Sequence, residues 1–197
     1  MDLDWLHKAL HGLPLGDLRF FTRIDSTNNE AVYWAEQGAP DLSLVVADEQ
    51  TAGRGREGRR WFTPPGSALA FSLVIKTFEA AGNLETSQIL SRLTGLGALA
   101  VSEALRRDYG LPAEIKWPND VLLERRKVAG VLAEAYWIGE QLSAVILGVG
   151  VNVSPDSVPP AGEVVFPADC VETLLGRPVE RLELLRAILV HLLAWRG

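Results

Sequence analysis

The sequence has almost none of the residues that disulfide and zinc chemistry require. Cys170 is the only cysteine among 197 residues, so an intrachain disulfide is excluded. His7, His11 and His191 are the only histidines. Structural zinc sites use four cysteine or histidine ligands in closely spaced sets, which this chain cannot supply. We therefore expect neither a disulfide scaffold nor a zinc centre.

Long apolar runs and an excess of positive charge are absent as well. The longest apolar runs, such as residues 144–151, are far shorter than the roughly 20 residues that span a bilayer. Residues 1–4 place acid where a secretory signal carries base. The formal net charge of −6 disfavours a surface that binds nucleic acid, because phosphate binding needs clustered cations. We expect a cytoplasmic protein that does not bind membranes.

The composition that remains is that of one ordinary folded domain. Hydrophobic residues make up 48% and charged residues 22% of the chain, which predicts a single α/β domain over residues 1–197. Residues 18–24 predict a strand, followed by a helix through Gln37 that Ser26 or Thr27 caps. Further strands are expected at 44–47, 68–75, 114–117, 127–135 and 142–153, and helices at 87–109, 168–175 and 181–195. The last three strands are expected to form antiparallel hairpins.

Residues 53–60, Gly-Arg-Gly-Arg-Glu-Gly-Arg-Arg, form a basic loop in an acidic protein. Four arginines and one glutamate give the loop a local charge of 4 − 1 = +3. Glycine lets a backbone approach a ligand closely, and guanidinium groups match pairs of carboxylate or phosphate oxygens. The loop therefore predicts a small anionic ligand, although a solvated basic hairpin tip is the alternative.

The same loop satisfies the dinucleotide-binding pattern G-x-G-x-x-G from Gly53 to Gly58. That pattern holds a pyrophosphate only where its last glycine opens a helix. Pro64, Pro65 and Gly66 follow almost at once and forbid a long helix. We therefore reject an oxidoreductase that uses a nicotinamide cofactor.

A second polar group surrounds a proline at residues 116–120, Lys-Trp-Pro-Asn-Asp. Proline keeps the residue before it extended, so this turn presents a cation, an amide and a carboxylate rigidly, although an ordinary β-turn selects the same residues. Lys127 begins a strand that is apolar on both faces. A lysine at that position is costly unless it meets an anion. Both segments are candidates for a site.

Small residues mark two further positions. Gly130, Gly148 and Gly150 lie inside expected strands, where glycine indicates the close approach of a ligand or backbone, or a β-bulge. Ser26 and Thr27 precede a helix and are typical of helix caps. The chain has no G-x-S-x-G motif and no plausible histidine partner, so Ser26 is not expected to be a nucleophile.

Taken in order, these blocks closely resemble the biotin protein ligases. The blocks are residues 25–28 (Asp-Ser-Thr-Asn), Gln50 with residues 53–61, residues 116–120, residues 126–130 and residues 148–152 (Gly-Val-Gly-Val-Asn). The resemblance runs from about Arg19 to Val153. It implies an α/β fold with a mixed, largely antiparallel sheet flanked by helices, the class II aminoacyl-tRNA synthetase-like core of the biotin and lipoate ligases.

The resemblance also implies roles for individual residues. The biotin-binding set would be Ser26, Thr27, Asn28, Gln50, Gly53, Arg54, Gly55, Arg56, Lys127 and Gly130. The ATP- and adenylate-binding set would be Arg59, Trp61, Lys116, Asn119, Asp120 and Asn152, with Trp61 packed on adenine and Asn152 at its edge. Lys127, Asp120 and Arg54 would be catalytic, and Asp120 would help to hold Mg²⁺ or the triphosphate.

The activity so implied is an ATP-dependent ligation that releases AMP. The enzyme would form biotinyl-5′-AMP and transfer biotin to a lysine of the biotin carboxyl carrier protein of acetyl-CoA carboxylase. A lipoate-protein ligase is the alternative, although lipoate ligases lack the Gly-Arg-Gly-Arg loop. A weakly catalytic module that binds biotin or its adenylate is another alternative.

Three expectations concern the whole chain. The sequence begins at the core, without the helix-turn-helix domain that makes some members repressors, so we expect no DNA binding. It stops at Gly197, where many members continue into a small β-rich domain, so we expect either a minimal ligase or weakened handling of ATP. Family members often pair through a sheet edge, which makes a homodimer a further expectation.

Overall fold

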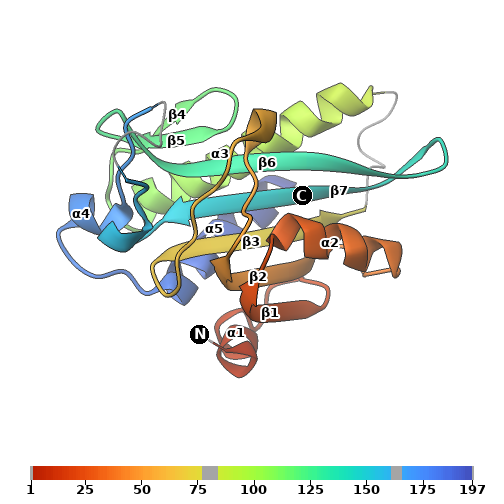
Figure 1. Ribbon diagram of the computed structural model, residues 1–197, viewed down its shortest axis with the longest axis horizontal. Helices are drawn as coiled ribbons and strands as arrows, with labels where there is room; N and C mark the ends of the chain where they lie inside the picture. Colours follow the sequence, from red (N-terminus) through yellow and green to blue (C-terminus); the bar gives the residue numbers. More distant parts are fainter. Residues whose placement is uncertain (1, 77–83, 161–165, 197) are drawn as a thin grey trace.

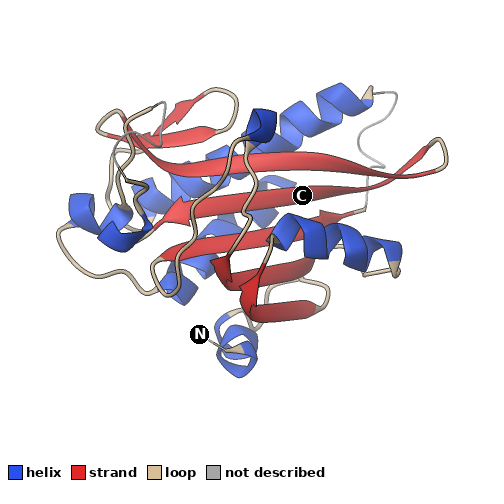
Figure 2. Ribbon diagram, viewed as in Figure 1, coloured by secondary structure: helices blue, strands red, loops and turns tan. Residues whose placement is uncertain are grey.

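The computed structural model describes residues 2–76, 84–160 and 166–196. Over these residues one seven-stranded sheet has the order β1-β2-β3-β7-β6-β5-β4; the strands are labelled in Figure 1 and drawn in red in Figure 2. The strands are β1 (Leu18–Ile24), β2 (Ser43–Gln50), β3 (Ala68–Ile75), β4 (Glu114–Lys116), β5 (Asp120–Leu123), β6 (Arg126–Ile138) and β7 (Gln141–Asn152). The helices are α1 (Leu3–Ala9), α2 (Thr27–Glu36), α3 (Thr86–Arg107), α4 (Val171–Leu175) and α5 (Arg181–Arg196), with short 3₁₀ turns η1 (Arg56–Gly58) and η3 (Pro155–Ser157).

The sheet is mixed and largely antiparallel, as predicted. β1 and β2 run parallel, and each of the other neighbouring pairs runs antiparallel. Of the predicted hairpins, the one between residues 127–135 and 142–153 is confirmed, whereas the strand at residues 114–117 pairs with the unpredicted β5 and not with β6. β6 and β7 form the confirmed hairpin, from the pair Ala129 and Val151 to the pair Ile138 and Gln141.

Side chains alternate between the two faces of the sheet along each strand, and the two faces have different neighbours. On β3, Leu69, Phe71 and Leu73 point into the main hydrophobic core, which α3 and α5 cover. Val74 belongs instead to a smaller cluster beneath α2, together with residues of β2 and β7. Figure 1 shows α2 on the near side of the sheet and α3 and α5 behind it. α3 therefore covers one sheet face, as its helical spacing predicted.

The face beneath α2 is the one that carries polar and small residues. Gly148 and Gly150 on β7, Gly130 on β6 and Ser72 on β3 all belong to this face, because they alternate with residues of the main core. α2 contacts β2, β3 and β7 and leaves the rest of the face to the loop that follows β2 (Figure 1). The sequence thus leaves part of this sheet surface without an apolar cover.

Three elements differ from the prediction. Helix α1 was not predicted, although Asp2 caps it by accepting a hydrogen bond from the Trp5 N–H. The four residues of β5 were not predicted as a strand, because a run this short shows no periodicity. Residues 168–170 were expected to be helical, whereas helix α4 begins only at Val171. These residues are extended because they pair with Lys127: its N–H donates to the Pro167 carbonyl at 2.8 Å, and its carbonyl accepts from the Asp169 N–H at 3.0 Å.

Candidate functional site

A cavity of about 860 Å³ opens on the face beneath α2. Segments far apart in sequence line it: the start of α2, the loop after β2, the turn before β5, and strands β6 and β7. A volume of this size is within the usual range for a small-molecule site. Of the residues predicted to form the site, the cavity brings together Ser26, Thr27, Asn28, Gln50, Gly53, Arg54, Gly55, Arg56, Arg59, Trp61, Lys116, Asn119, Asp120, Lys127 and Gly130.

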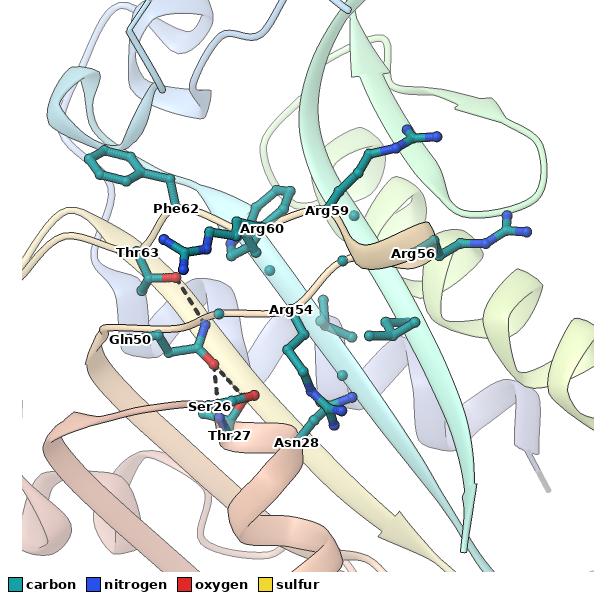
Figure 3. Close-up of a pocket in the computed structure, with 18 of the residues that line it drawn as sticks. Ser26, Thr27, Asn28, Gln50, Arg54, Arg56, Arg59, Arg60, Phe62 and Thr63 are labelled. Atoms are coloured by element: carbon teal, nitrogen blue, oxygen red, sulfur yellow. Dashed lines mark hydrogen bonds between the residues drawn. The ribbon is translucent and has the colours of Figure 1, made fainter. Parts of the chain in front are cut away.

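Gln50 fixes the end of the cavity where α2 begins. Its Oε1 accepts hydrogen bonds from the Thr27 N–H at 2.8 Å and the Thr27 hydroxyl at 3.1 Å. Its Nε2 donates to the Thr63 hydroxyl at 3.0 Å (Figure 3). Ser26 holds the N-cap position, but its side chain makes no cap hydrogen bond. Ser26 is 1% exposed and lines the cavity, so its side chain can serve a ligand.

A hydrogen-bonded chain continues from Thr27 across the sheet. The fully buried Ser72 hydroxyl lies 2.8 Å from Thr27 Oγ1 and 2.6 Å from Asn28 Oδ1. Asn28 Nδ2 donates to Glu134 Oε2 at 2.6 Å, and Arg54 Nη2 lies 2.6 Å from the same oxygen. Strand β3, helix α2, strand β6 and the basic loop are therefore joined by polar contacts at one side of the cavity.

The basic loop folds back on itself as a narrow hairpin without a long helix. Isolated bridges join Gln50 to Thr63 and Arg54 to Arg60. A Cβ on Gly53 would lie 2.4 Å from the Trp61 carbonyl oxygen, so glycine is required there. Because only the three-residue turn η1 follows the Gly-x-Gly pattern, the structure agrees with the rejection of a dinucleotide site.

Three of the four loop arginines have polar partners within the protein. Arg54 pairs with Glu134, and Arg59 lies 2.5 Å from the exposed Glu57 of its own loop. Arg56 donates to the Asn119 side-chain carbonyl at 3.1 Å. Figure 3 shows Arg54 pointing toward Asn28, whereas Arg56 and Arg59 point away from it. Glu134 therefore neutralises part of the local charge of the loop, and Glu57 pairs with Arg59 within the loop itself.

Lys127 meets an anion, as its position at the mouth of a buried strand predicted. Its Nζ lies 2.6 Å from Asp120 Oδ1. Asn119 Nδ2 donates to the same oxygen at 3.0 Å, and Lys116 Nζ lies 3.8 Å from Asp120 Oδ2. Asp120 is mostly buried, with 11% of its side chain exposed, so two lysines balance one carboxylate inside the cavity.

This carboxylate does not fit a resident divalent cation. Both oxygens of Asp120 face ammonium or amide groups, which disfavour a cation at the same place. In the described parts of the chain no three side chains of the His, Cys, Asp and Glu types are grouped to hold a metal ion. Any Mg²⁺ would therefore be bound mainly by phosphate groups and water.

Trp61 lies across the floor of the cavity. A Cβ on Gly150 would lie 2.3 Å from the indole ring, and a Cβ on Gly130 would lie 3.1 Å from it. Lys127 Nζ is 5.4 Å from the ring centroid, and the indole N–H is buried without a hydrogen-bond partner. The strand glycines allow close approach, but the approaching groups are side chains and not the expected ligand or backbone: Trp61 lies over Gly130 and Gly150, and Asn28 lies over Gly148.

Asn152 is the predicted residue that the cavity does not include. It is 3% exposed, and its Nδ2 donates to the Asp169 carbonyl at 3.0 Å. The sequence analysis in turn did not identify Ser72, Glu134 or Phe166. The centroid of the Phe166 ring lies 4.1 Å from Lys116 Nζ. For Ser72 and Glu134 a signal was present, because each is a polar residue inside an otherwise apolar strand.

A second hollow, of about 470 Å³, lies between the end of α3 and α5. His191 Nε2 is 2.9 Å from Asp108 Oδ2 there. Burial raises the pKa of the neighbouring Tyr109 hydroxyl, and the charges of Glu183 and Asp108 raise this pKa further. None of the residues predicted to form the site lies in this hollow, so the first cavity is the candidate site.

Comparison with known proteins places the chain in a family. Residues 20–152 match the model of the biotin/lipoate A/B protein ligase family. This range includes all of the predicted site residues. Across the residues that the structure describes, no helix has the length and apolar character needed to cross a membrane.

Individual relatives extend this likeness. The chain is 39% identical over 180 residues to a biotin--[acetyl-CoA-carboxylase] ligase of Paracoccus denitrificans. This alignment covers 89% of the chain and 71% of that protein. It is 34% identical over 167 residues to the bifunctional ligase/repressor BirA of Bacillus spizizenii. That alignment covers 85% of the chain but only 50% of BirA. The chain therefore spans about half the length of this BirA.

A solved structure shows the same fold. The biotin protein ligase of Aquifex aeolicus in complex with biotin and ATP superimposes with a TM-score of 0.73 at 32% sequence identity. The superposition covers 90% of this chain and 69% of that one. The expected class II aminoacyl-tRNA synthetase-like core is thus confirmed.

Proposed function

The chain belongs to the biotin/lipoate A/B protein ligase family, and we propose that it is the catalytic core of a biotin protein ligase. It would form biotinyl-5′-AMP from biotin and ATP, and then transfer biotin to a lysine of the biotin carboxyl carrier protein of acetyl-CoA carboxylase. The observation that carries this proposal is the meeting of the basic loop, Asp120 and Lys127 around one cavity. The names of its relatives support the choice of biotin and of the carboxylase.

The neutral end of biotin would bind where α2 begins. The ureido ring of biotin carries a carbonyl acceptor and two N–H donors, which need polar partners inside a protein. Ser26 lines the cavity, and Thr27 and Gln50, which also line it, are already oriented by hydrogen bonds to each other. Asn28 and Gly53 complete this end of the predicted biotin-binding set.

The charged end of biotin would then extend toward Lys127. In the first step a carboxylate oxygen attacks the α-phosphorus of ATP, the bond to the β-phosphate oxygen breaks, and pyrophosphate leaves. Negative charge gathers on the oxygens around phosphorus during this step. The ammonium group of Lys127 would stabilise that charge, since it is already held inside the cavity by Asp120 and needs little rearrangement.

The adenylate would be held by the remaining polar residues. Arg59, Lys116 and Asn119 would contact the phosphates, and Trp61 would turn its ring to the adenine. The Trp61 indole N–H is buried without a hydrogen-bond partner, which is unfavourable. This supports a change in the position of the ring when the ligands bind. Mg²⁺ would enter with ATP, bound to the triphosphate, with Asp120 as the nearby carboxylate.

The second step transfers biotin to the acceptor protein. The neutral amine of the acceptor lysine attacks the acyl carbonyl, the bond from that carbon to the phosphate oxygen breaks, and AMP leaves as the amine loses a proton. No covalent link to the enzyme is needed. Because acyl-adenylates hydrolyse readily, the loop of residues 53–60 would exclude water by covering the cavity until the acceptor arrives.

An exchange experiment tests this proposal against its alternatives. The purified chain is incubated with ATP, Mg²⁺ and labelled pyrophosphate, and the label that enters ATP is measured with biotin, with lipoate and with neither acid. We expect exchange that depends on biotin. Exchange with lipoate alone would replace the substrate assignment by that of a lipoate ligase. Binding of biotin without any exchange would show a binding module instead of an enzyme.

A further inference from the structure

Glu134 is a charged residue on the site face of the sheet that the proposed reaction does not use. Its Oε2 accepts a hydrogen bond from Asn28 Nδ2 at 2.6 Å and forms the ion pair with Arg54 at 2.6 Å. These partners lie 106 and 80 residues away in sequence. A single carboxylate oxygen therefore joins the start of α2 to the basic loop.

The first of these partners is held firmly in place. Asn28 Oδ1 accepts a hydrogen bond from the buried Ser72 hydroxyl at 2.6 Å. A Cβ on Gly148 would lie 2.1 Å from the same oxygen, so the Asn28 side chain lies flat against the β7 backbone. Because both ends of the Asn28 amide have partners, Glu134 receives a donor from a fixed direction.

The second partner belongs to the loop that covers the cavity. Arg54 lies at the base of the hairpin, where it bridges to Arg60 and where the Gly55 N–H donates to the Arg59 carbonyl at 2.8 Å. Its guanidinium group points toward Asn28 and away from the outward-pointing Arg56 and Arg59 (Figure 3). Holding this one side chain therefore holds the backbone of residues 53–60 over the sheet.

We propose that Glu134 is a positioning residue, and that Asn28, Glu134 and Arg54 form a clasp that keeps the basic loop over the cavity. In this clasp the Arg54 guanidinium acts through the backbone that it anchors, and it does not bind the carboxylate or phosphates of the ligand. This assignment rests on the proposed function, and it replaces the catalytic role that the family resemblance implied for Arg54. The ligand's anionic groups are then left to Lys127, Lys116 and Arg59.

The two roles for Arg54 predict effects of opposite sign when Glu134 loses its charge. If Arg54 bound the ligand's anion, the Glu134 carboxylate would compete for it, and Glu134→Gln would strengthen binding of the anion. If the clasp positions the loop, the same change weakens binding, because the charge-assisted contact to Arg54 is lost. Glu134→Gln keeps the size of the side chain and an oxygen that Asn28 can still donate to.

Binding is measured by calorimetry with biotin and with its uncharged amide, in the absence of ATP. We expect Glu134→Gln to weaken both ligands equally, by about tenfold, the size expected for a lost hydrogen bond to a charged group. Tighter or unchanged binding of biotin would overturn the clasp, and so would a loss confined to the charged ligand. Glu140→Gln, the same change in the exposed turn of the same hairpin, is the matched control.

A cycle with Arg54→Gln then tests whether the two residues act together. The double variant is expected to bind biotin no more weakly than either single variant, because one contact is removed in all three. Additive losses would show that Arg54 and Glu134 act separately, and would contradict the clasp. Thermal unfolding of each variant shows that the comparison is made between folded proteins.

Hydrogen exchange without ligand separates the clasp from the proposed function. We expect Glu134→Gln to speed amide exchange in residues 53–60 by about tenfold and to leave the strand β3 unchanged. Unaltered exchange in the loop would overturn the clasp. If the unmodified protein binds neither biotin nor lipoate, the proposed function fails, whereas the exchange result still decides whether Glu134 holds the loop.

Discussion

Lys127 lies in the cavity with its backbone and its side chain both fixed. Its N–H and carbonyl pair with Pro167 and Asp169, and its ammonium group is 2.6 Å from Asp120 Oδ1. Such a group can stabilise developing negative charge without first reorganising. This arrangement makes Lys127 the residue on which the proposed chemistry most depends.

Replacing Lys127 by alanine is expected to slow adenylate formation by about 10²–10³-fold, the usual loss when one stabilising group is removed from a transition state. The measurement is the biotin-dependent exchange of pyrophosphate into ATP. Lys8→Ala, at an exposed lysine of α1, is the control for removal of one surface charge. A Lys127→Ala protein that folds normally and exchanges at the unmodified rate would disprove the role of this lysine.

Gly148 is expected to tolerate no side chain while Asn28 is present. A Cβ there would lie 2.1 Å from Asn28 Oδ1, so Gly148→Ala should lower the free energy of unfolding by about 1–3 kcal/mol, as overpacking does. The matched test places Gly148→Ala in an Asn28→Ala background, where the cost of the methyl group should largely vanish. Denaturant unfolding measures both values, and an equal cost in the two backgrounds would exclude this contact as the cause.

At the residue scale the sequence identified members of the site better than their partners. The motifs named Gln50, Lys127 and Asp120, and all three line the cavity. They did not reveal that Glu134 neutralises Arg54, because an ion pair across 80 residues depends on the register of β6. Ser26 was interpreted first as a helix cap, and its side chain makes no such hydrogen bond.

At the scale of elements, the glycines of the basic loop have different tasks. A Cβ on Gly53 would lie 2.4 Å from the Trp61 carbonyl, whereas the nearest contact for a Cβ on Gly55 is 3.3 Å. Gly53→Ala is therefore expected to force the two sides of the hairpin apart and to weaken biotin binding by about tenfold or more, and Gly55→Ala by less. Calorimetry measures the biotin affinity of both variants. A larger loss of affinity for Gly55→Ala than for Gly53→Ala would contradict the hairpin geometry.

One arginine adds a polar link between the sheet and helix α5, which also packs on the main core. Arg181 at the start of α5 lies 2.6 Å from Asp48 Oδ1 and donates to the Ala68 carbonyl at 3.1 Å, with 16% of its side chain exposed. Arg181→Met should lower the free energy of unfolding by about 3 kcal/mol, because it leaves a largely buried carboxylate unpaired. Adding Asp48→Leu should recover much of that loss in denaturant unfolding. A double variant less stable than the single one would refute this explanation.

Periodicity and glycine or proline boundaries predicted the longer elements well. The strands Leu18–Ile24 and Ala68–Ile75 have the predicted bounds. Both ends of α3 lie within two residues of the predicted ends. Two of the errors concern short segments whose conformation depends on a distant partner, whereas the missed helix α1 has a local cap at Asp2. Residues 168–170 are extended through pairing with Lys127, and β5 exists through pairing with β4 and β6.

At the scale of the whole molecule, the sheet order explains why distant motifs meet. β3, β7 and β6 are neighbours, so the glycines of β6 and β7 and the serine of β3 share one face, and the loop after β2 crosses above them (Figure 1). From the sequence, the order of the motifs could be compared with a family, but their convergence could not be derived from periodicity. The fold supplies that convergence, and the family match over residues 20–152 covers the same segments.

The most direct test of the central claim is mass-spectrometric detection of the intermediate. The purified chain is mixed with biotin, ATP and Mg²⁺ without an acceptor protein, and the products are extracted and separated. We predict biotinyl-5′-AMP and pyrophosphate in amounts comparable to the protein, and far less of both with Lys127→Ala. Absence of this adenylate from a protein that binds both biotin and ATP would contradict the account.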